Sequence, residues 1–146
     1  MCSYDKSALR MKEKYRKYYS NNFIHYPVCP IPGWELLIDT IIEKVIKFNQ
    51  TRKEENQTVK IFQIKQKFSR LVVYLETAKT TNKTPTIERF NSELWEEPIK
   101  ELDQEIQKIA SKGYITCKIC GKEKVQTVDN SRIKFKCLNH WNDRRS

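Results

Sequence analysis

The 146-residue sequence predicts an α+β protein, in which helices pack on a small antiparallel sheet and a cysteine-rich module follows at the C-terminus. Three observations lead to this fold class. Apolar residues recur at helical spacing within 34–46, β-branched and aromatic residues dominate 58–75, and two short-spaced pairs of metal-ligand residues lie within 117–140. We expect three parts: a basic N-terminal helix and connector over 1–28, an α+β core over 29–112, and the cysteine module over 113–146.

The first segment, residues 3–19, has the spacing of a helix. Its aromatic and apolar residues recur every three or four positions between lysines and arginines: Tyr4, Ala8, Met11, Tyr15 and Tyr18. Stacking on a nucleic acid is one use of such a pattern. We favour a peripheral helix, an appendage to the core that buries its tyrosines and solvates its lysines. The proline-rich stretch 21–33 then predicts an extended connector.

The clearest helix covers residues 33–48. Its apolar residues form one wide stripe: Trp34, Leu37, Ile38, Ile41, Ile42, Val45 and Ile46. A stripe of this width packs against a sheet or another helix. The segment is therefore expected to belong to the core rather than to carry chemistry.

A β-hairpin is predicted over 58–75, with a short polar link at 66–70, and residues 77–86 are expected to form an exposed loop. Helices are expected over 86–112, in two pieces. The first piece carries apolar residues at helical spacing: Ile87, Phe90, Leu94 and Trp95. The second begins at Pro98, which suits a first helical turn, and ends at Gly113.

The strongest chemical signal is the order Cys117-x2-Cys120-Gly121, a 16-residue spacer and Cys137-x2-His140. Two such pairs predict a tetrahedral zinc site of the ribbon type, with a hairpin in the spacer that returns the second pair to the first. Gly121 allows the backbone twist that the cysteine turn needs. Four protein ligands indicate a structural zinc, whereas a water in place of His140 would leave an open position.

Other readings of the cysteines remain open. Disulfides or free buried thiols are the alternatives at the C-terminus, and disulfides are disfavoured because no secretory signal is visible. Cys2 and Cys29 do not join the zinc set by spacing. His25 and Cys29 would supply half of a second metal site without a partner pair, so a buried cysteine and a hydrogen-bonded histidine are favoured there.

The net charge is +10, and the positive charge is concentrated in three stretches. Residues 1–20 carry +4, 59–84 carry +5 and 111–146 carry +6. Such a chain attracts anions at long range, although charge that only maintains solubility is the alternative. The basic residues of the C-terminal module are Lys118, Lys122, Lys124, Arg132, Lys134, Lys136, Arg144 and Arg145.

Three motifs in one order carry a resemblance. They are Gly33-Trp34-x-x-Leu37-Ile38, Gln63-Ile64-Lys65-x-Lys67-Phe68-x-x-Leu71-x-x-Tyr74, and the cysteine module. Over roughly residues 29–140 the chain resembles small, mostly uncharacterised phage-encoded proteins with a Q-(I/V)-K-E-K-F-G-x-L-R-F-Y-like motif before a CxxCG…CxxH ribbon. This chain departs from the motif, because Gln66, Ser69 and Val72 stand where it has Glu, Gly and Arg.

The loss of that Glu removes the best acid–base candidate of the hairpin. What remains is a candidate anion-binding set without a nucleophile or base: Gln63, Lys65, Lys67, Arg70 and Tyr74. A basic, solvated hairpin turn is the alternative. No catalytic residue is predicted.

These features favour a non-catalytic binder of a phosphate-bearing ligand. The ligand is a nucleic acid or, in a phage setting, a nucleotide immune signal that an anti-defence protein sequesters. A zinc-ribbon module that inhibits a host protein is the alternative. A nuclease or phosphodiesterase is less favoured because HxH, HD, HExxH and GxSxG motifs are missing from the sequence. Apolar runs of at most five residues predict no membrane span, so we expect a cytoplasmic protein, in the host if phage-encoded, with self-assembly left open.

Overall fold

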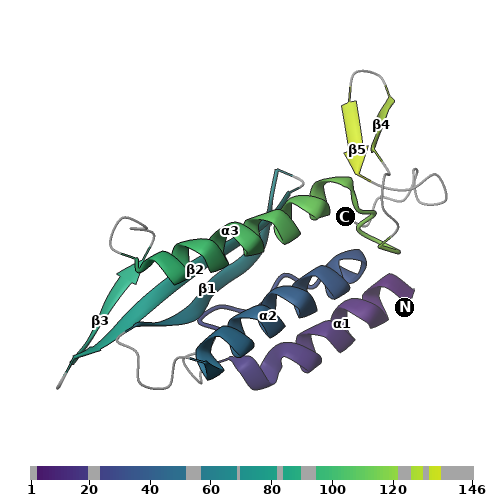
Figure 1. The fold of residues 1–146 in the computed structure, drawn as a ribbon. Coiled ribbons are helices and arrows are strands. Elements are labelled where there is room, and N and C mark those ends of the chain that lie inside the picture. The colour runs from purple at the N-terminus through teal and green to yellow at the C-terminus, as the bar shows by residue number, and fades with distance from the viewer. Residues whose placement is uncertain are drawn as a thin grey trace.

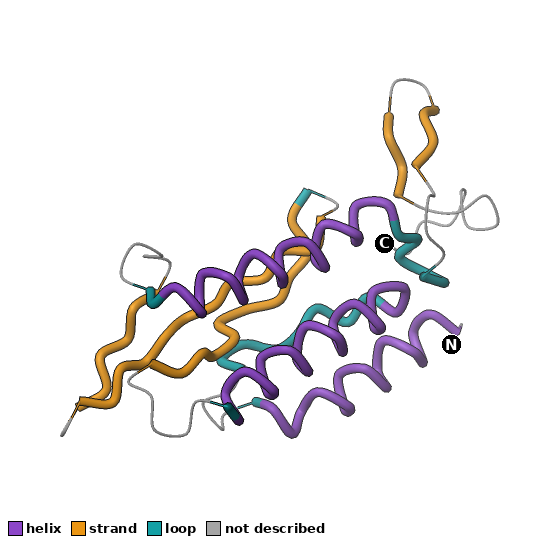
Figure 2. Tube along the Cα trace, in the orientation of Figure 1, coloured by secondary structure: helices purple, strands orange, loops and turns teal. Residues whose placement is uncertain are grey.

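In the computed structural model, helices α2 and α3 cover one face of a three-stranded antiparallel sheet, and α1 lies beside α2 (Figures 1 and 2). The structure describes residues 3–19, 24–51, 57–68, 70–81, 84–89, 95–121, 126–129 and 132–135. This arrangement confirms the α+β class with helices on a small antiparallel sheet. None of the helices in these ranges has the length and apolar character that crossing a bilayer requires.

Helix α1 spans Ser3–Tyr15 and continues as a short 3₁₀ turn over Arg16–Tyr18. Met11 and Tyr15 are fully buried in the same cluster as the residues of α2, while Lys12, Lys14 and Lys17 are exposed. The predicted burial of tyrosine and solvation of lysine are therefore confirmed, but the helix belongs to the core and the prediction that it is an appendage is wrong. The many charged residues of the segment indicate a surface helix, although the side chains of Met11 and Tyr15 are enough to anchor it in the core. The helix runs in the same direction as α2, because Arg10 contacts Glu35 and Lys14 contacts Asp39.

Helix α2 spans Glu35–Gln50 and is preceded by a 3₁₀ turn over Pro32–Trp34. The predicted stripe is confirmed, since Ile38, Ile41 and Val45 are fully buried and Trp34 lies beneath the first turn. Pro32 stands at the first position of the 3₁₀ turn, where its missing N–H is no loss.

Strands β1 (Gln57–Lys67) and β2 (Arg70–Thr81) form the predicted hairpin. Their pairing ends at Lys67 opposite Arg70, so the expected five-residue polar link is in fact a two-residue turn. A bulge between Ile61 and Gln63 shifts the register by one residue. As a result Ile61 and Ile64, three residues apart, both point towards the helices and are fully buried.

Strand β3 (Thr84–Arg89) pairs with β2 from Thr81 opposite Thr84 to Glu76 opposite Arg89. The predictions of a loop over 77–86 and a helix from 86 are therefore wrong in this region. Threonines favour strands although they also occur in loops, and here the two threonine-rich stretches pair with each other. Phe90 and Leu94 lie outside the described residues, and Trp95 is buried before α3 begins.

Helix α3 (Glu97–Ser111) begins with Pro98 in its first turn, as predicted, and continues as a 3₁₀ turn over Lys112–Ile115. It buries Ile99, Leu102 and Ile106 against the sheet and α2. Helix α3 ends at Ser111, two residues before the predicted stop at Gly113, and the 3₁₀ turn continues through this glycine. Gly113 packs against Leu71 and Trp34, and a Cβ there would come within 2.8 Å of the Leu71 Cβ.

Residues 24–29 of the connector between α1 and α2 run along the edge of β1 that does not pair with β2. Ile24 forms a parallel bridge with Ile61, and the Cys29 N–H donates to the Ile64 carbonyl at 3.0 Å. This extended course agrees with the proline content of the segment. It places His25 next to the face of the sheet that the helices do not cover.

The spacer of the cysteine module contains the predicted hairpin, with β4 (Gln126–Asp129) antiparallel to β5 (Arg132–Phe135). Cys137 and His140 lie outside the described residues.

Candidate functional site

The five residues predicted to bind an anion share one face of the β1–β2 hairpin. Gln63 lies opposite Tyr74, and Lys67 lies opposite Arg70, while Lys65 faces Val72. Opposite residues of an antiparallel pair point to the same side, and neighbours along a strand alternate. Because Ile64 and Val73 point towards the helices, the predicted set lies on the other face, which we call the outer face.

Cations on the hairpin lie against aromatic rings. The Lys65 Nζ is 5.2 Å from the centroid of the Tyr74 ring, and the Lys67 Nζ is 5.9 Å from that of Phe68. The Arg70 guanidinium is 4.8 Å from the Tyr114 ring of the turn after α3. Residues 57–75 contain no Asp or Glu, so these cations are not neutralised by their own strands before Glu76.

A hollow of about 430 Å³ opens beside Arg70, between the edge of β2 and the end of α3. It is lined by Arg70, Leu71, Val72, Gln107, Ala110, Ser111 and Tyr114. Gln107 donates its side-chain amide to the Val73 carbonyl at 3.2 Å, which helps to hold α3 on this strand. The hollow extends the candidate site from the outer face to the edge of the sheet.

The hairpin also carries an acid, which the sequence pattern did not single out. Glu76 is 1% exposed, and its carboxylate contacts the His25 imidazole. In the sheet, Lys60 lies opposite Glu76 on one side and Arg89 on the other. The sequence does show one acid in a strand whose other charged residues are basic. It could not show the contact with His25, because that residue lies 51 positions earlier in the chain.

The rings of Phe62, His25 and Tyr26 gather near this acid. The Phe62 centroid is 6.1 Å from that of His25 and 5.0 Å from that of Tyr26, which meets it edge to face. Because Glu76 and this aromatic cluster lie towards the middle of the sheet, the positive end of the outer face is the hairpin tip.

The first half of the predicted zinc site is a tight turn. The Gly121 N–H donates to the Cys117 carbonyl at 2.9 Å, and Gly121 has φ of 79°, so the predicted need for glycine is confirmed. The thiol of Cys117 is buried, whereas Cys120 is exposed. Within the described residues, no three His, Cys, Asp or Glu side chains gather as metal ligands.

This turn is docked on the start of α2. The Gly33 N–H donates to the Lys118 carbonyl at 2.7 Å, and a Cβ on Gly33 would lie only 1.8 Å from the Cys117 carbonyl oxygen. A Cβ on Gly121 would in turn approach the Gly33 carbonyl at 3.0 Å. Two glycines distant in sequence thus let the cysteine turn contact the helix backbone directly.

Lys118 lies within this docked turn. Its side chain is 4% exposed, and its Nζ is 5.8 Å from the Trp34 ring centroid. The prediction that Lys118 adds to the cationic surface of the module is therefore wrong. Its positive charge is placed against the core instead.

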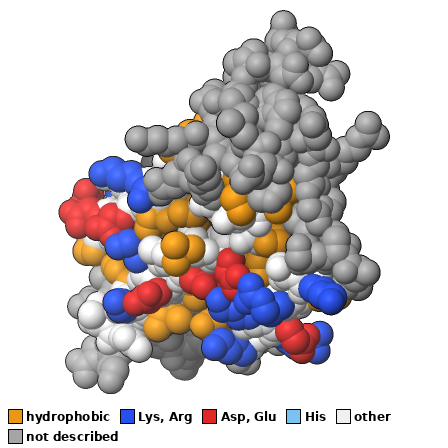
Figure 3. Space-filling view, turned by 90° about the vertical axis from the view of Figure 1, so that its right-hand side faces the viewer, with side chains coloured by type: hydrophobic (Ala, Val, Ile, Leu, Met, Phe, Trp, Pro, Cys, Tyr) orange, Lys and Arg blue, Asp and Glu red, His pale blue; other side chains and the backbone are white. Residues whose placement is uncertain are grey.

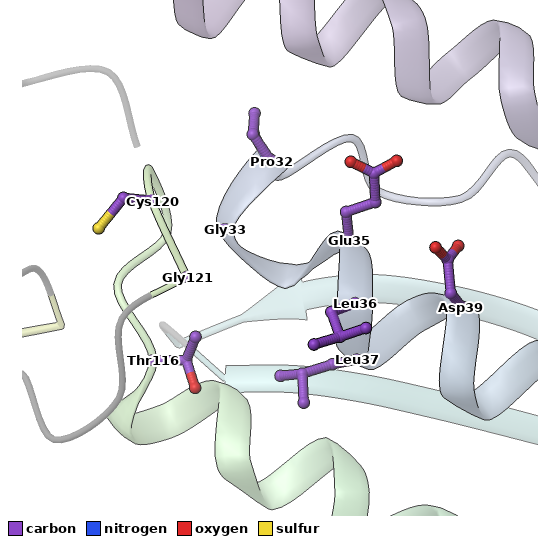
Figure 4. Close-up of a pocket in the computed structure, with 9 residues that line it drawn as sticks. All are labelled: Pro32, Gly33, Glu35, Leu36, Leu37, Asp39, Thr116, Cys120 and Gly121. Carbon is purple, nitrogen blue, oxygen red and sulfur yellow. The ribbon is translucent and has the colours of Figure 1, made fainter.

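A pocket of about 380 Å³ lies where the cysteine turn meets α2 (Figure 4). Glu35, Asp39 and Cys120 line it, but the Cys120 side chain points away from both carboxylates. The sulfur is therefore directed out of the pocket rather than towards the acids.

Those acids serve the packing of α1 on α2. Lys14 donates to both Glu35 and Asp39, at 2.9 and 2.6 Å, and Arg10 forms a two-point contact with Glu35. The hydrogen bond from Arg10 lowers the pKa of Glu35 to about 2. Burial and a hydrogen bond to Asp39 raise the pKa of Tyr15 above its ordinary value. Acidic and basic side chains are interspersed on the face of the molecule in Figure 3, so this face has no single sign.

Comparison of the chain with protein-family models, with curated proteins and with solved structures found no match.

Proposed function

We propose that the protein binds a phosphate-bearing ligand through the outer face of the β1–β2 hairpin. The observation that carries this proposal is the placement of Gln63, Lys65, Lys67, Arg70 and Tyr74 on one face. Lysine and arginine neutralise phosphate charge, and glutamine and tyrosine add hydrogen-bond donors. The absence of acids from 57–75 favours a positive potential around these side chains.

The proposed role is binding rather than chemistry. The one acid in strands β1 and β2 is Glu76, which is buried and engaged with His25. A general base must reach the proton that it removes, and a carboxylate enclosed in this way serves that purpose poorly. Nucleic acid and a sequestered nucleotide, in the phage setting that the sequence resemblance suggests, are the two ligand classes within this proposal.

We also propose that the C-terminal module binds one structural zinc ion through Cys117, Cys120, Cys137 and His140. Two observations support the first pair: the turn geometry at Gly121 and the docking of the turn on Gly33. Three thiolates and one imidazole are a donor set that Zn²⁺ prefers. When bound, the zinc would tie the end of the chain to the start of α2.

The experiment that tests the proposed ligand begins with the purified protein. The ratio of absorbance at ~260 nm to that at ~280 nm, before and after a high-salt wash, detects bound nucleic acid, because phosphate contacts weaken steeply with salt. A small nucleotide would survive the wash and be released on denaturation. Binding of labelled oligonucleotides and nucleotides is then measured by fluorescence anisotropy and calorimetry.

The matched variants separate a site from general charge. The double variant Lys65→Gln and Lys67→Gln removes two charges from the outer face, while Lys12→Gln and Lys108→Gln remove two exposed charges from α1 and α3. We expect the first pair to reduce affinity at least about tenfold and to make the slope of log K against log[salt] shallower by the equivalent of about two phosphate contacts. The second pair should change affinity and slope little. Equal effects of the two pairs, or no binding of any phosphate ligand by the native protein, would contradict the proposal.

A further inference from the structure

Phe68 at the tip of the hairpin carries two unfavourable features at once. Its side chain is 86% exposed, although it is a large apolar ring. Its φ is 50°, in the left-handed region that bulky residues rarely adopt. Two-residue hairpin turns favour Asn or Gly where φ is positive, so a phenylalanine here is not what the turn itself requires.

A strained residue of this kind is common where its side chain contacts a ligand. A backbone outlier of this kind lowers the stability of the fold, and outliers of this kind cluster at ligand-binding sites. Exposure of the ring gains nothing in folding, since no water is removed from its surface. The two features together make Phe68 the candidate residue for a contact with another molecule.

The surroundings of the ring indicate the chemistry of that molecule. Lys67 and Arg70, which flank the turn in register, are exposed, and the Lys67 Nζ lies 5.9 Å from the Phe68 ring centroid. Behind them on the outer face, Lys65 lies against Tyr74. An aromatic ring between cations suits a ligand that alternates flat apolar groups with negative charges.

We propose that the hairpin tip binds single-stranded nucleic acid, with Phe68 stacking on an unpaired base while Lys65, Lys67 and Arg70 neutralise the adjacent phosphates. This inference rests on the proposed function and names its ligand class. Aromatic stacking with a basic track is how proteins hold single strands without reading their sequence. A duplex offers its base faces only after unstacking.

The exposure of the ring also argues against a small nucleotide as the principal ligand. A site for a small molecule covers most of its ligand's surface in a concavity. A ring that is 86% open at a protruding turn covers one side of a base at most. A polymer that continues past the tip can use such a ring, because its neighbouring phosphates are held elsewhere.

The test compares a labelled oligothymidine of about 12 nucleotides with a duplex of the same length, by fluorescence anisotropy at matched salt. We expect the native protein to favour the single strand. Phe68→Asn should weaken single-strand binding about tenfold, the size of one lost stacking contact, and change duplex binding little. Phe68→Tyr, which keeps an aromatic ring, should retain the affinity.

Folding is controlled within the same variant. Asparagine tolerates positive φ, so Phe68→Asn should have an unchanged or higher Tm although it binds less. Leu36→Ala removes a different exposed apolar side chain, 77% exposed on α2, and should leave binding unchanged.

The outcomes are distinguishable. Equal affinity for single strand and duplex, or full single-strand affinity in Phe68→Asn, overturns the role of Phe68, while loss of affinity in the Lys65 and Lys67 variants would still support the proposed anion site. Binding of a small nucleotide without binding of the polymer overturns this inference alone. Absence of binding to every phosphate ligand overturns both this inference and the proposed function. If an acidic protein then binds through Phe68, the occupant of the hairpin tip is a protein instead.

Discussion

At the scale of single residues, two glycines decide how the cysteine turn meets the core. Gly33 and Gly121 allow backbone to approach backbone where any side chain would collide, and the Gly33 N–H finds its acceptor in the turn itself. The backbones come this close because neither glycine places a Cβ between them. Substitutions here act by steric conflict rather than by loss of an apolar contact.

Gly33→Ala should destabilise the protein by about 2 kcal/mol or more, because the new Cβ would overlap the Cys117 carbonyl and force the turn away from α2. Urea unfolding followed by circular dichroism measures the change. Leu36→Ala, three residues along and exposed, serves as the control and should stay within about 0.5 kcal/mol of the native protein. Equal stability of the Gly33 variant and the native protein would contradict the docking.

Glu35 makes part of the stability depend on pH. Its pKa is lowered to about 2 by the hydrogen bond from Arg10, so its ionised form stabilises the folded chain above the unfolded pKa of about 4.5. That contribution should be lost as pH falls from about 5 towards 2. The difference in unfolding free energy between the native protein and Glu35→Gln should therefore be constant at neutral pH and shrink through this window.

The partner variant Arg10→Gln controls that experiment. Arg10 and Glu35 share one contact, so the double variant should be less destabilised than the sum of the two single variants. A difference that is independent of pH, or strict additivity, would show that the ion pair does not stabilise the fold.

At the scale of elements, the hairpin separates stability from binding by its two faces. The bulge between Ile61 and Gln63 keeps the buried residues of β1 on the helix side and the candidate ligand residues on the outer side. Adjacent positions of one strand therefore have different roles. Ile64 is fully buried, while its neighbour Lys65 contacts Tyr74 on the outer face.

Ile64→Ala should lower the unfolding free energy by about 2–5 kcal/mol, because it leaves a cavity between the sheet and the helices. Lys65→Gln should change stability by no more than about 0.5 kcal/mol and reduce phosphate-ligand affinity instead. Parallel measurement of urea midpoints and binding checks both. A large loss of stability in Lys65→Gln would show that the outer face is structural.

The elements also show what sequence patterns can predict. The stripe of α2, the start of α3 at Pro98, the hairpin and the glycine after Cys120 were all predicted, because each depends on local spacing. Strand β3 was missed, since its threonines resemble a loop and Ile87 fits helical spacing with the apolar residues that follow it. The contact between His25 and Glu76, and the exposure of Phe68, depend on tertiary structure and left no local pattern.

At the scale of the whole molecule, the proposed zinc would act on a turn that is already joined to the core. The Gly33 amide, the Trp34 ring and the Lys118 side chain meet at that junction. Metal binding by the C-terminal module would then stabilise the start of α2 as well as the module. For this reason we expect zinc to raise the Tm of the whole protein and not only that of the module.

The purified protein should contain about one zinc per chain, and removal of the metal by a chelator should lower Tm, with about 3–4 kcal/mol lost if free zinc had exceeded its Kd by several hundred-fold. Elemental analysis and thermal unfolding measure both. Cys137→Ser should abolish the metal, whereas Cys29→Ser, a half-buried thiol outside the predicted set, should retain it. Zinc content that depends on Cys29, or is unaffected by Cys137→Ser, would contradict the assignment.

Strand β2 has a further consequence for how copies of the protein behave towards one another. Strand β3 pairs with β2 only from Glu76 onwards, so among the described strands residues 70–75 have a neighbour on one side alone. Gln107 reaches this strand from α3 and occupies the carbonyl of Val73. A helix side chain thereby occupies an acceptor that a strand of another molecule would need for pairing. We therefore expect Gln107 to hinder edge-to-edge aggregation and to contribute to resistance against fibre growth.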